Sequence, residues 1–191
     1  MSSTNAPFGL RPAYHPSGLD RATALADGIA SAYATAILKG QPVKMDTSGT
    51  IVVAAAGDAF MGAFSGVEWT DTTGRRRISN YWPANTAYQT GSCVAYFYAD
   101  QQIVYEIQAD GSLAQSSIGD EADFTNATAG SNVTGLSQAT ISTTLVGAGN
   151  SAQMRIIDIA PYSDNAWGDD YVIVRANISE YQFAPAAGTA I

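Results

Sequence analysis

The chain has very little of what catalysis and metal binding usually require. One cysteine, Cys93, and one histidine, His15, occur in 191 residues. A single cysteine excludes an intrachain disulfide and a cysteine-based zinc site. A Ser-His-Asp or Cys-His device would have to use His15. This histidine lies between Tyr14 and Pro16, where nothing rigid is expected to hold an imidazole in register. We therefore expect no enzyme, no catalytic residue, no metal site and no cofactor.

Two acidic clusters are the remaining candidates for acid–base chemistry or cation binding. Asp120, Glu121 and Asp123 form one cluster, and Asp169 and Asp170 form the other. Both lie in turn-like segments, where acidic residues are common for conformational reasons. The ligand spacing of a calcium-binding loop is absent from both. The residues alone leave open whether these loops bind a cation.

Charge is also scarce, and the balance is acidic. Charged residues make up 14% of the chain, and 17 acidic against 9 basic residues give a net charge of −8. Such a field repels nucleic acid, because phosphate binding needs clustered Lys and Arg. The one basic cluster, Arg75 to Arg77, is better explained as a solvated turn edge or a set of salt bridges. We expect no direct contact with nucleic acid.

Long apolar runs are absent as well. The opening "MSSTNAPFGLRP" lacks the apolar core of a signal peptide, and no apolar run reaches the length of a membrane span. We expect no membrane contact and a protein made in a cytoplasm. The low charge content suits a protein whose surface is partly covered by partners, although a polar β-protein could reach it unaided.

What the chain does contain is a series of short runs rich in β-branched and aromatic residues, separated by turn residues. The pattern predicts an all-β fold, a single β-barrel or sandwich-like domain of roughly nine or ten short strands. We place this domain at residues 27–183, after an extended N-terminal arm at 1–26 and before a C-terminal tail at 184–191. Gly62 and Gly66 are predicted to mark a bulge or bend, and "DTTG" a turn that could bring Trp69 and Trp82 together.

Two segments raise the question of what covers them. "CVAYFYADQQIVYEIQADGS", residues 93–112, has the pattern of a β-hairpin, but both of its faces are largely apolar. The arm is rich in Pro and Gly, yet it carries Phe8, Leu10 and Tyr14. We expect the arm to dock by these anchors on something other than its own core, by strand addition to a neighbouring subunit.

Several short motifs in the same order resemble a family of tailed-phage capsid decoration proteins, also called head cement or auxiliary head proteins. They are "NAPFGLRP", "ILKGQPVKM", "AAAGDAFMGAFSGVEWTDTTG", "YWP", the 93–112 segment and "MRIIDIA". The resemblance covers about Asn5 to Phe183 and is weakest from Asn126 to Asn150. It implies a structural virion protein on the outer surface of an icosahedral capsid, made in the host cytoplasm. There it would cement the shell by bridging subunits of the major capsid protein.

We expect self-association, because an exposed apolar hairpin face needs cover and closed symmetric assemblies usually provide it. The resemblance favours a trimer, and a dimer is possible. The residues that we predict to contact the capsid or another copy are Phe8, Leu10, Arg11, Tyr14, Tyr96, Tyr98 and Tyr105. The alternative function is a carbohydrate-binding or glycan-hydrolysing module of a phage tail. It rests on acidic clusters close to aromatic residues, above all Trp167 beside Asp169 and Asp170.

Overall fold

The structure is a computed structural model that describes residues 4–18, 21–147 and 150–184. Within these residues the backbone forms fifteen strands, one short 3-10 turn at Gln115–Ser117 and no α-helix. Ten of the strands have three or more residues, and five have two. The prediction of an all-β, sandwich-like fold is confirmed. No helix among the described residues has the length and apolar character needed to cross a bilayer.

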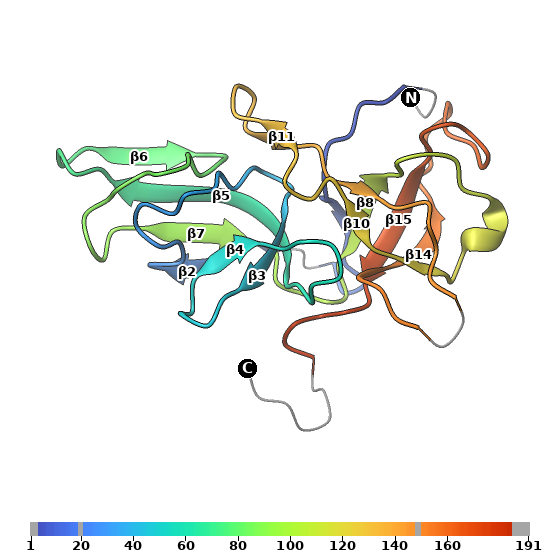
Figure 1. The fold of residues 1–191 in the computed structure, drawn as a ribbon, viewed down its shortest axis with the longest axis horizontal. Helices are drawn as coiled ribbons and strands as arrows, with labels where there is room; N and C mark the ends of the chain where they lie inside the picture. Colours follow the sequence, from blue (N-terminus) through green and yellow to red (C-terminus); the bar gives the residue numbers. More distant parts are fainter. Residues whose placement is uncertain (1–3, 19–20, 148–149, 185–191) are drawn as a thin grey trace.

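Two larger antiparallel sheets organise the chain (Figure 1). The first sheet has the strand order β1-β8-β15-β14-β9. Its strands are β1 (Arg11–Tyr14), β8 (Val104–Gln108), β15 (Ile173–Ile178), β14 (Met154–Ile159) and β9 (Glu121–Ala122). The order is far from the sequence order, so most neighbours in this sheet come from distant parts of the chain.

The second sheet has the order β2-β7-β5-β3-β4, and β6 pairs with β5 beside it. Its strands are β2 (Thr23–Ala26), β7 (Val94–Phe97), β5 (Gly62–Thr70), β3 (Pro42–Met45), β4 (Ile51–Val53) and β6 (Arg76–Ser79). Two small two-stranded pairs complete the fold: β10 (Phe124–Thr125) with β13 (Thr140–Ile141), and β11 (Gly130–Ser131) with β12 (Leu136–Ser137).

Each large sheet has its own hydrophobic core. The core of the first sheet includes Phe60 and Phe124, whose ring centroids are 4.9 Å apart in an edge-on contact. The core of the second sheet includes Trp69 and Trp82, 5.4 Å apart, which confirms the predicted contact between these two indoles. Figure 1 accordingly shows the strands of the two sheets at opposite ends of the long axis.

Local predictions within the second sheet also agree with the structure. The register between β5 and β7 shifts between Phe64 and Gly66, as expected for a bulge at this glycine. Asp71 begins the predicted turn, and its carboxylate accepts hydrogen bonds from the backbone N–H groups of Thr73 and Arg75. The segment from 27 to 45 is non-helical and enters β3 after an isolated bridge between Ile37 and Trp82.

The predicted hairpin at 93–112 is wrong. β7 pairs with β5 and β2, whereas β8 pairs with β1 and β15, so the two runs belong to different sheets. The turn residues between them carry the chain from one sheet to the other instead of folding it back. Both faces of this segment are apolar because the protein itself covers them: all five residues of β8 are buried.

The N-terminal segment is extended, as predicted, but it docks on its own chain. β1 pairs with β8 at the edge of the first sheet, and β2 pairs with β7 in the second. Leu10 is 1% exposed and belongs to the first core. Pro12 is tolerated because β1 is an edge strand with one unpaired side. The expected C-terminal tail at 184–191 lies, except for Ala184, outside the described residues.

Candidate functional site

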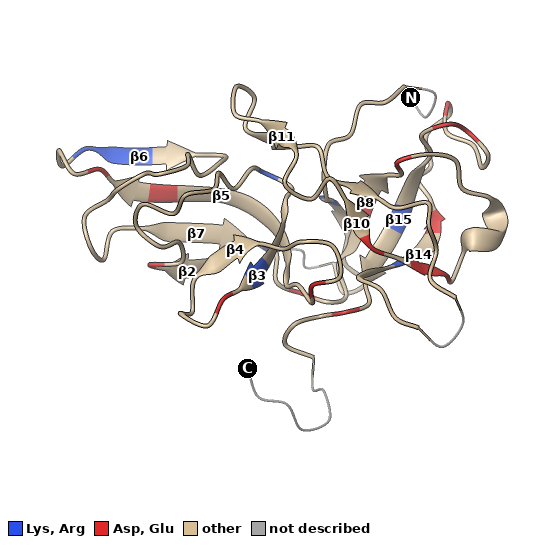
Figure 2. Ribbon diagram, in the orientation of Figure 1, with Lys and Arg blue, Asp and Glu red and all other residues tan. Residues whose placement is uncertain are grey.

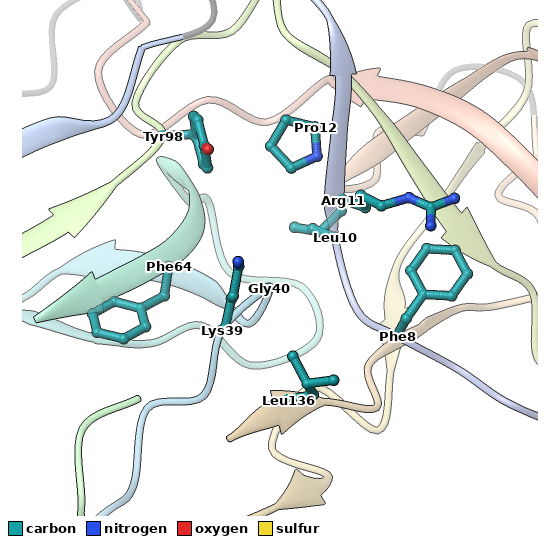
Figure 3. A pocket seen from close by; sticks show the side chains of 9 residues that line it. All are labelled: Phe8, Leu10, Arg11, Pro12, Lys39, Gly40, Phe64, Tyr98 and Leu136. Atoms are coloured by element: carbon teal, nitrogen blue, oxygen red, sulfur yellow. The ribbon is translucent and has the colours of Figure 1, made fainter. Parts of the chain in front are cut away.

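A pocket of about 440 Å³ opens at the junction of the two sheets (Figure 3). Its walls come from the N-terminal segment, the residues before β3, the start of β5, the residue after β7, and β12. Most of the lining is apolar, including Phe64 and Leu136. Four of the seven predicted contact residues line it: Phe8, Leu10, Arg11 and Tyr98. We call this pocket the junction groove.

Main-chain hydrogen bonds fix the floor of the junction groove. The Leu10 N–H donates to the Gly40 carbonyl, and the Gly40 N–H donates to the Phe64 carbonyl, both at 2.8 Å. Gly9 has φ +72, and a Cβ at this position would lie 2.5 Å from the Gly40 oxygen. Only glycine fits here, because both the left-handed backbone and the close approach exclude a side chain. The N-terminal segment is therefore locked onto the second sheet as well as the first.

Lys39 supplies a positive charge in this apolar setting. Its side chain is exposed and, within the described residues, makes no ion pair or hydrogen bond. Figure 3 shows its amino group directed into the open middle of the groove. The backbone of Lys39 is held on both sides, because its N–H donates to the Gly135 carbonyl and its carbonyl accepts from Ser137. A carboxylate of a bound partner would find an uncompensated cation here.

Arg11, by contrast, is already engaged. Its guanidinium lies 2.7 Å from the carboxylate of Glu106, which is 6% exposed, and 4.5 Å from the centre of the Phe8 ring. Tyr162 donates a hydrogen bond to the same carboxylate at 2.5 Å, and Arg175 approaches it at 3.4 Å. Arg11 also contacts the Tyr162 hydroxyl. We call these four charged and phenolic side chains the Glu106 clasp.

The environment of Glu106 keeps it ionised. Burial alone would raise the pKa of this carboxyl group, but hydrogen bonds from Tyr162 and Arg11 and the nearby positive charges outweigh burial and lower it. The clasp joins β1 to β8 and β15 across the outer face of the first sheet. Arg11 therefore serves the attachment of β1 to its own sheet, and the predicted contact between Arg11 and a partner has little support.

The remaining predicted contact residues do not come together. Tyr14 is 43% exposed on the edge strand β1. Tyr96 is half-buried on β7 and donates to Glu68 at 3.2 Å. Tyr105 is fully buried in the first core, and burial raises the pKa of its phenol strongly. A partner cannot reach Tyr105 in this fold, so that part of the prediction is wrong.

Sequence reasoning missed three exposed aliphatic side chains, of which Leu136 lines the groove. Val133, at the tip of the β11–β12 hairpin, is 96% exposed, and Leu136 is 43% exposed and also lines the groove. The side chain of Asn80 donates to the Thr134 carbonyl at 3.2 Å, which holds the hairpin near the end of β6, where Ile78 is 75% exposed. The sequence feature that could have indicated these exposed side chains is the presence of isolated aliphatic residues within a Gly/Ser/Thr-rich turn. Such a signal is weak, because single exposed aliphatic residues are common.

The basic cluster is a set of salt bridges, as predicted. Figure 2 shows β6 as a basic edge of the second sheet, beside an acidic residue on β5. Arg76 pairs with Glu68 at 2.5 Å, and Arg77 pairs with Asp71 at 3.0 Å. In the first sheet Glu121 pairs with Arg155 at 2.5 Å and also accepts from Ser179. In residues 4–18, 21–147 and 150–184, no group of three or more His, Cys, Asp or Glu side chains could hold a metal ion.

His15 is better held than the sequence suggested. Its Nδ1 accepts from the Ser17 N–H at 3.0 Å, and its Nε2 lies 3.3 Å from the Asp100 carboxylate. The Ser17 hydroxyl is 2.6 Å from Nδ1. The contact between residues 15 and 17 is a local turn, and none of the three residues lines the junction groove. The arrangement anchors the loop after β1 to the crossing segment between β7 and β8.

Comparison with known proteins adds no relative to this description. The chain matches no protein-family model, no curated protein and no solved structure. The resemblance to capsid decoration proteins therefore stays a prediction drawn from the sequence motifs.

Proposed function

We propose that this chain is a structural protein of a phage virion that decorates the outer surface of the capsid and bridges subunits of the major capsid protein. The observation that carries the proposal is the junction groove, a largely apolar pocket that is lined by the exposed Leu136 and by Lys39, which has no ion-pair partner among the described residues. Apolar surface gathered in one region, with polar residues around it, is typical of protein-binding sites.

The chemistry of the groove favours one kind of occupant. Phe8, Pro12 and Leu136 would contact a bulky apolar side chain, and Lys39 would pair with a carboxylate next to it. We therefore propose that the occupant is an extended segment of the capsid protein with an apolar anchor and an acidic residue. Each large apolar side chain fully buried on binding contributes on the order of 1.5–3 kcal/mol. Many copies bridging adjacent subunits would add such contributions and raise the barrier to opening the shell.

The role is tested on purified particles. Mass spectrometry should detect the chain at high copy number in virions, and its absence there would refute the proposed role. The site is tested by decoration of shells that lack the protein, with Lys39→Glu and Leu136→Asp. Both variants should bind shells at least roughly tenfold more weakly. Arg21→Glu is the matched control, because Arg21 is exposed and does not line the groove.

Self-association belongs to the same proposal. Self-association would cover the exposed apolar side chains when the protein is not on the shell. The resemblance to decoration proteins favours a trimer, and a dimer is the second candidate. Light scattering at micromolar concentration measures this state directly. A stable monomer would contradict self-association in solution.

The alternative of a tail carbohydrate module finds no support at the segment that suggested it. Trp167 is half-buried and packs against the first core, so its ring is not an open platform. Asp169 accepts a hydrogen bond from the Ala166 N–H within a tight turn. This segment has the geometry of a structural turn.

A further inference from the structure

A second pocket, of about 370 Å³, has a different chemistry from the junction groove. It lies where the N-terminal segment meets the loops after β8 and β10, β13 and the loop before β15. Its polar lining comes from Asn5, Asp110, Asn126, Gln138, Thr140 and Tyr171. The two pockets share no lining residue.

Several polar groups in this pocket are unused. Within the described residues, the side-chain amides of Asn5, Asn126 and Gln138 and the Tyr171 hydroxyl make no hydrogen bond. A carboxamide both donates and accepts hydrogen bonds. These three amides, without a partner among the described residues, belong to side chains that line one pocket, so they offer paired donors and acceptors to a ligand.

A buried side chain, Gln108, fixes the backbone around Asn5 and Tyr171. Gln108 is 1% exposed, and its amide accepts from the Ala6 N–H and donates to the Thr4 carbonyl, both at 3.0 Å. The same amide also donates to the Tyr171 carbonyl at 3.3 Å. One buried side chain thus positions both Asn5 and Tyr171 at the pocket.

The opposite wall is also defined. Asn126 has φ +54, a left-handed backbone that asparagine tolerates better than most residues, and its carbonyl accepts from the Ala129 N–H at 2.8 Å. The Gln138 N–H donates to the Ala129 carbonyl at 2.8 Å. Main-chain bonds therefore fix the backbone of both residues before any ligand binds.

The pocket offers no charge suited to an ionic ligand. No Lys, Arg or His lines it. Both oxygens of its one carboxylate, Asp110, already accept hydrogen bonds, from Thr143 N–H at 2.8 Å and from the Thr125 hydroxyl at 3.2 Å. An anion would find no cation here, and a cation would find one carboxylate already in use. The site fits a neutral ligand with many hydroxyl groups.

We propose that this pocket is a saccharide-binding site for one or two neutral sugar units. Vicinal hydroxyls would exchange hydrogen bonds with the amides of Asn5, Asn126 and Gln138. The Tyr171 ring would contact the apolar face of a sugar. Sugar binding at this place is independent of the junction groove and goes beyond decoration, because it would give the protein affinity for glycans.

The test uses the full-length protein without capsids. Oligomers of glucose, galactose, mannose and N-acetylglucosamine are screened by saturation-transfer NMR, and hits are measured by calorimetry. We expect binding by at least one neutral saccharide, weakened roughly tenfold by Gln138→Ala and by Asn126→Gly, which keeps the left-handed backbone. Gln115→Ala, an exposed amide outside the pocket, should bind like the wild type.

Two results would overturn the proposal. One is the absence of any saccharide signal at concentrations on the order of 10 mM. The other is undiminished binding by both pocket variants, whose folding is checked by thermal unfolding. Stronger binding of sulfated or sialylated sugars than of neutral ones would also contradict it, since the pocket has no cation for them. None of these outcomes depends on capsid decoration.

Discussion

Leu10 tests whether the N-terminal segment is part of the folded domain or a separate arm. The side chain is 1% exposed and belongs to the core of the first sheet. Truncating a buried leucine to alanine usually costs about 2–5 kcal/mol, from lost burial and the cavity left behind. We expect Leu10→Ala to lower the free energy of unfolding by about 3 kcal/mol. With a urea m-value of roughly 2 kcal/mol/M, the midpoint should fall by about 1.5 M.

The assay is urea unfolding followed by tryptophan fluorescence and by circular dichroism. Leu136→Ala is the control, because Leu136 is 43% exposed and its truncation should cost less than about 1 kcal/mol. A free arm predicts the same small effect for both variants. If Leu10→Ala shifts the midpoint no more than Leu136→Ala does, the packing of Leu10 in the core is not what holds the segment.

Three further predictions follow from single contacts. Because the pKa of Glu106 is lowered in the folded state, its contribution to stability is present above the ordinary value of 4.5 and is lost as the pH falls through the folded value. Glu106→Gln should therefore flatten the pH dependence of stability below the ordinary value of 4.5. An unchanged dependence would exclude the Glu106 clasp as its source. A Cβ at Gly62 would lie 1.9 Å from the Tyr98 carbonyl oxygen, so Gly62→Ala should lower the free energy of unfolding by about 3 kcal/mol or prevent folding. Gly119→Ala is the control, because Gly119 has φ +94 and open space around it, and this variant should cost about 1 kcal/mol by chemical denaturation. Equal effects of the two substitutions would contradict the predicted clash. Burial raises the pKa of Cys93 to about 11, so this thiol should react with a thiol reagent at pH 8 only after unfolding, and rapid reaction in the native protein would show that the second core opens.

The sequence predicted the positions of the strands better than it predicted which strands pair with each other. Alternating and apolar runs indicated where strands lie, and the bulge at Gly66 and the turn at Asp71 were predictable because both depend on residues close in the chain. The strands at 94–97 and 104–108 were located correctly but paired wrongly. A four-residue turn signal is the same whether the chain folds back or crosses to another sheet, and the choice depends on distant strands.

The error about the N-terminal segment has a similar origin. Few apolar residues and several prolines indicate that a segment cannot fold alone, but they do not say what it docks on. Leu10 packs in a core that includes residues as distant in the chain as Ile178, and Arg11 forms an ion pair with Glu106. The junction groove was unpredictable for the same reason, since Leu10, Lys39 and Leu136 meet through main-chain bonds between remote segments.

If the groove binds a capsid segment as proposed, that binding would also stabilise the fold. Its lining belongs to both sheets, and the Leu10 backbone bonded to Gly40 connects them. A segment bound there would contact the folded arrangement and not the unfolded chain. It would therefore stabilise the fold by RT ln(1 + [L]/Kd), about 2.7 kcal/mol when the local concentration of the segment is 100 times Kd. If the partner is a capsid as proposed, the lattice would fix that local concentration. Binding would then stabilise the folded N-terminal segment, and the same contacts would stabilise the shell. The two effects are the same coupling free energy seen from each partner.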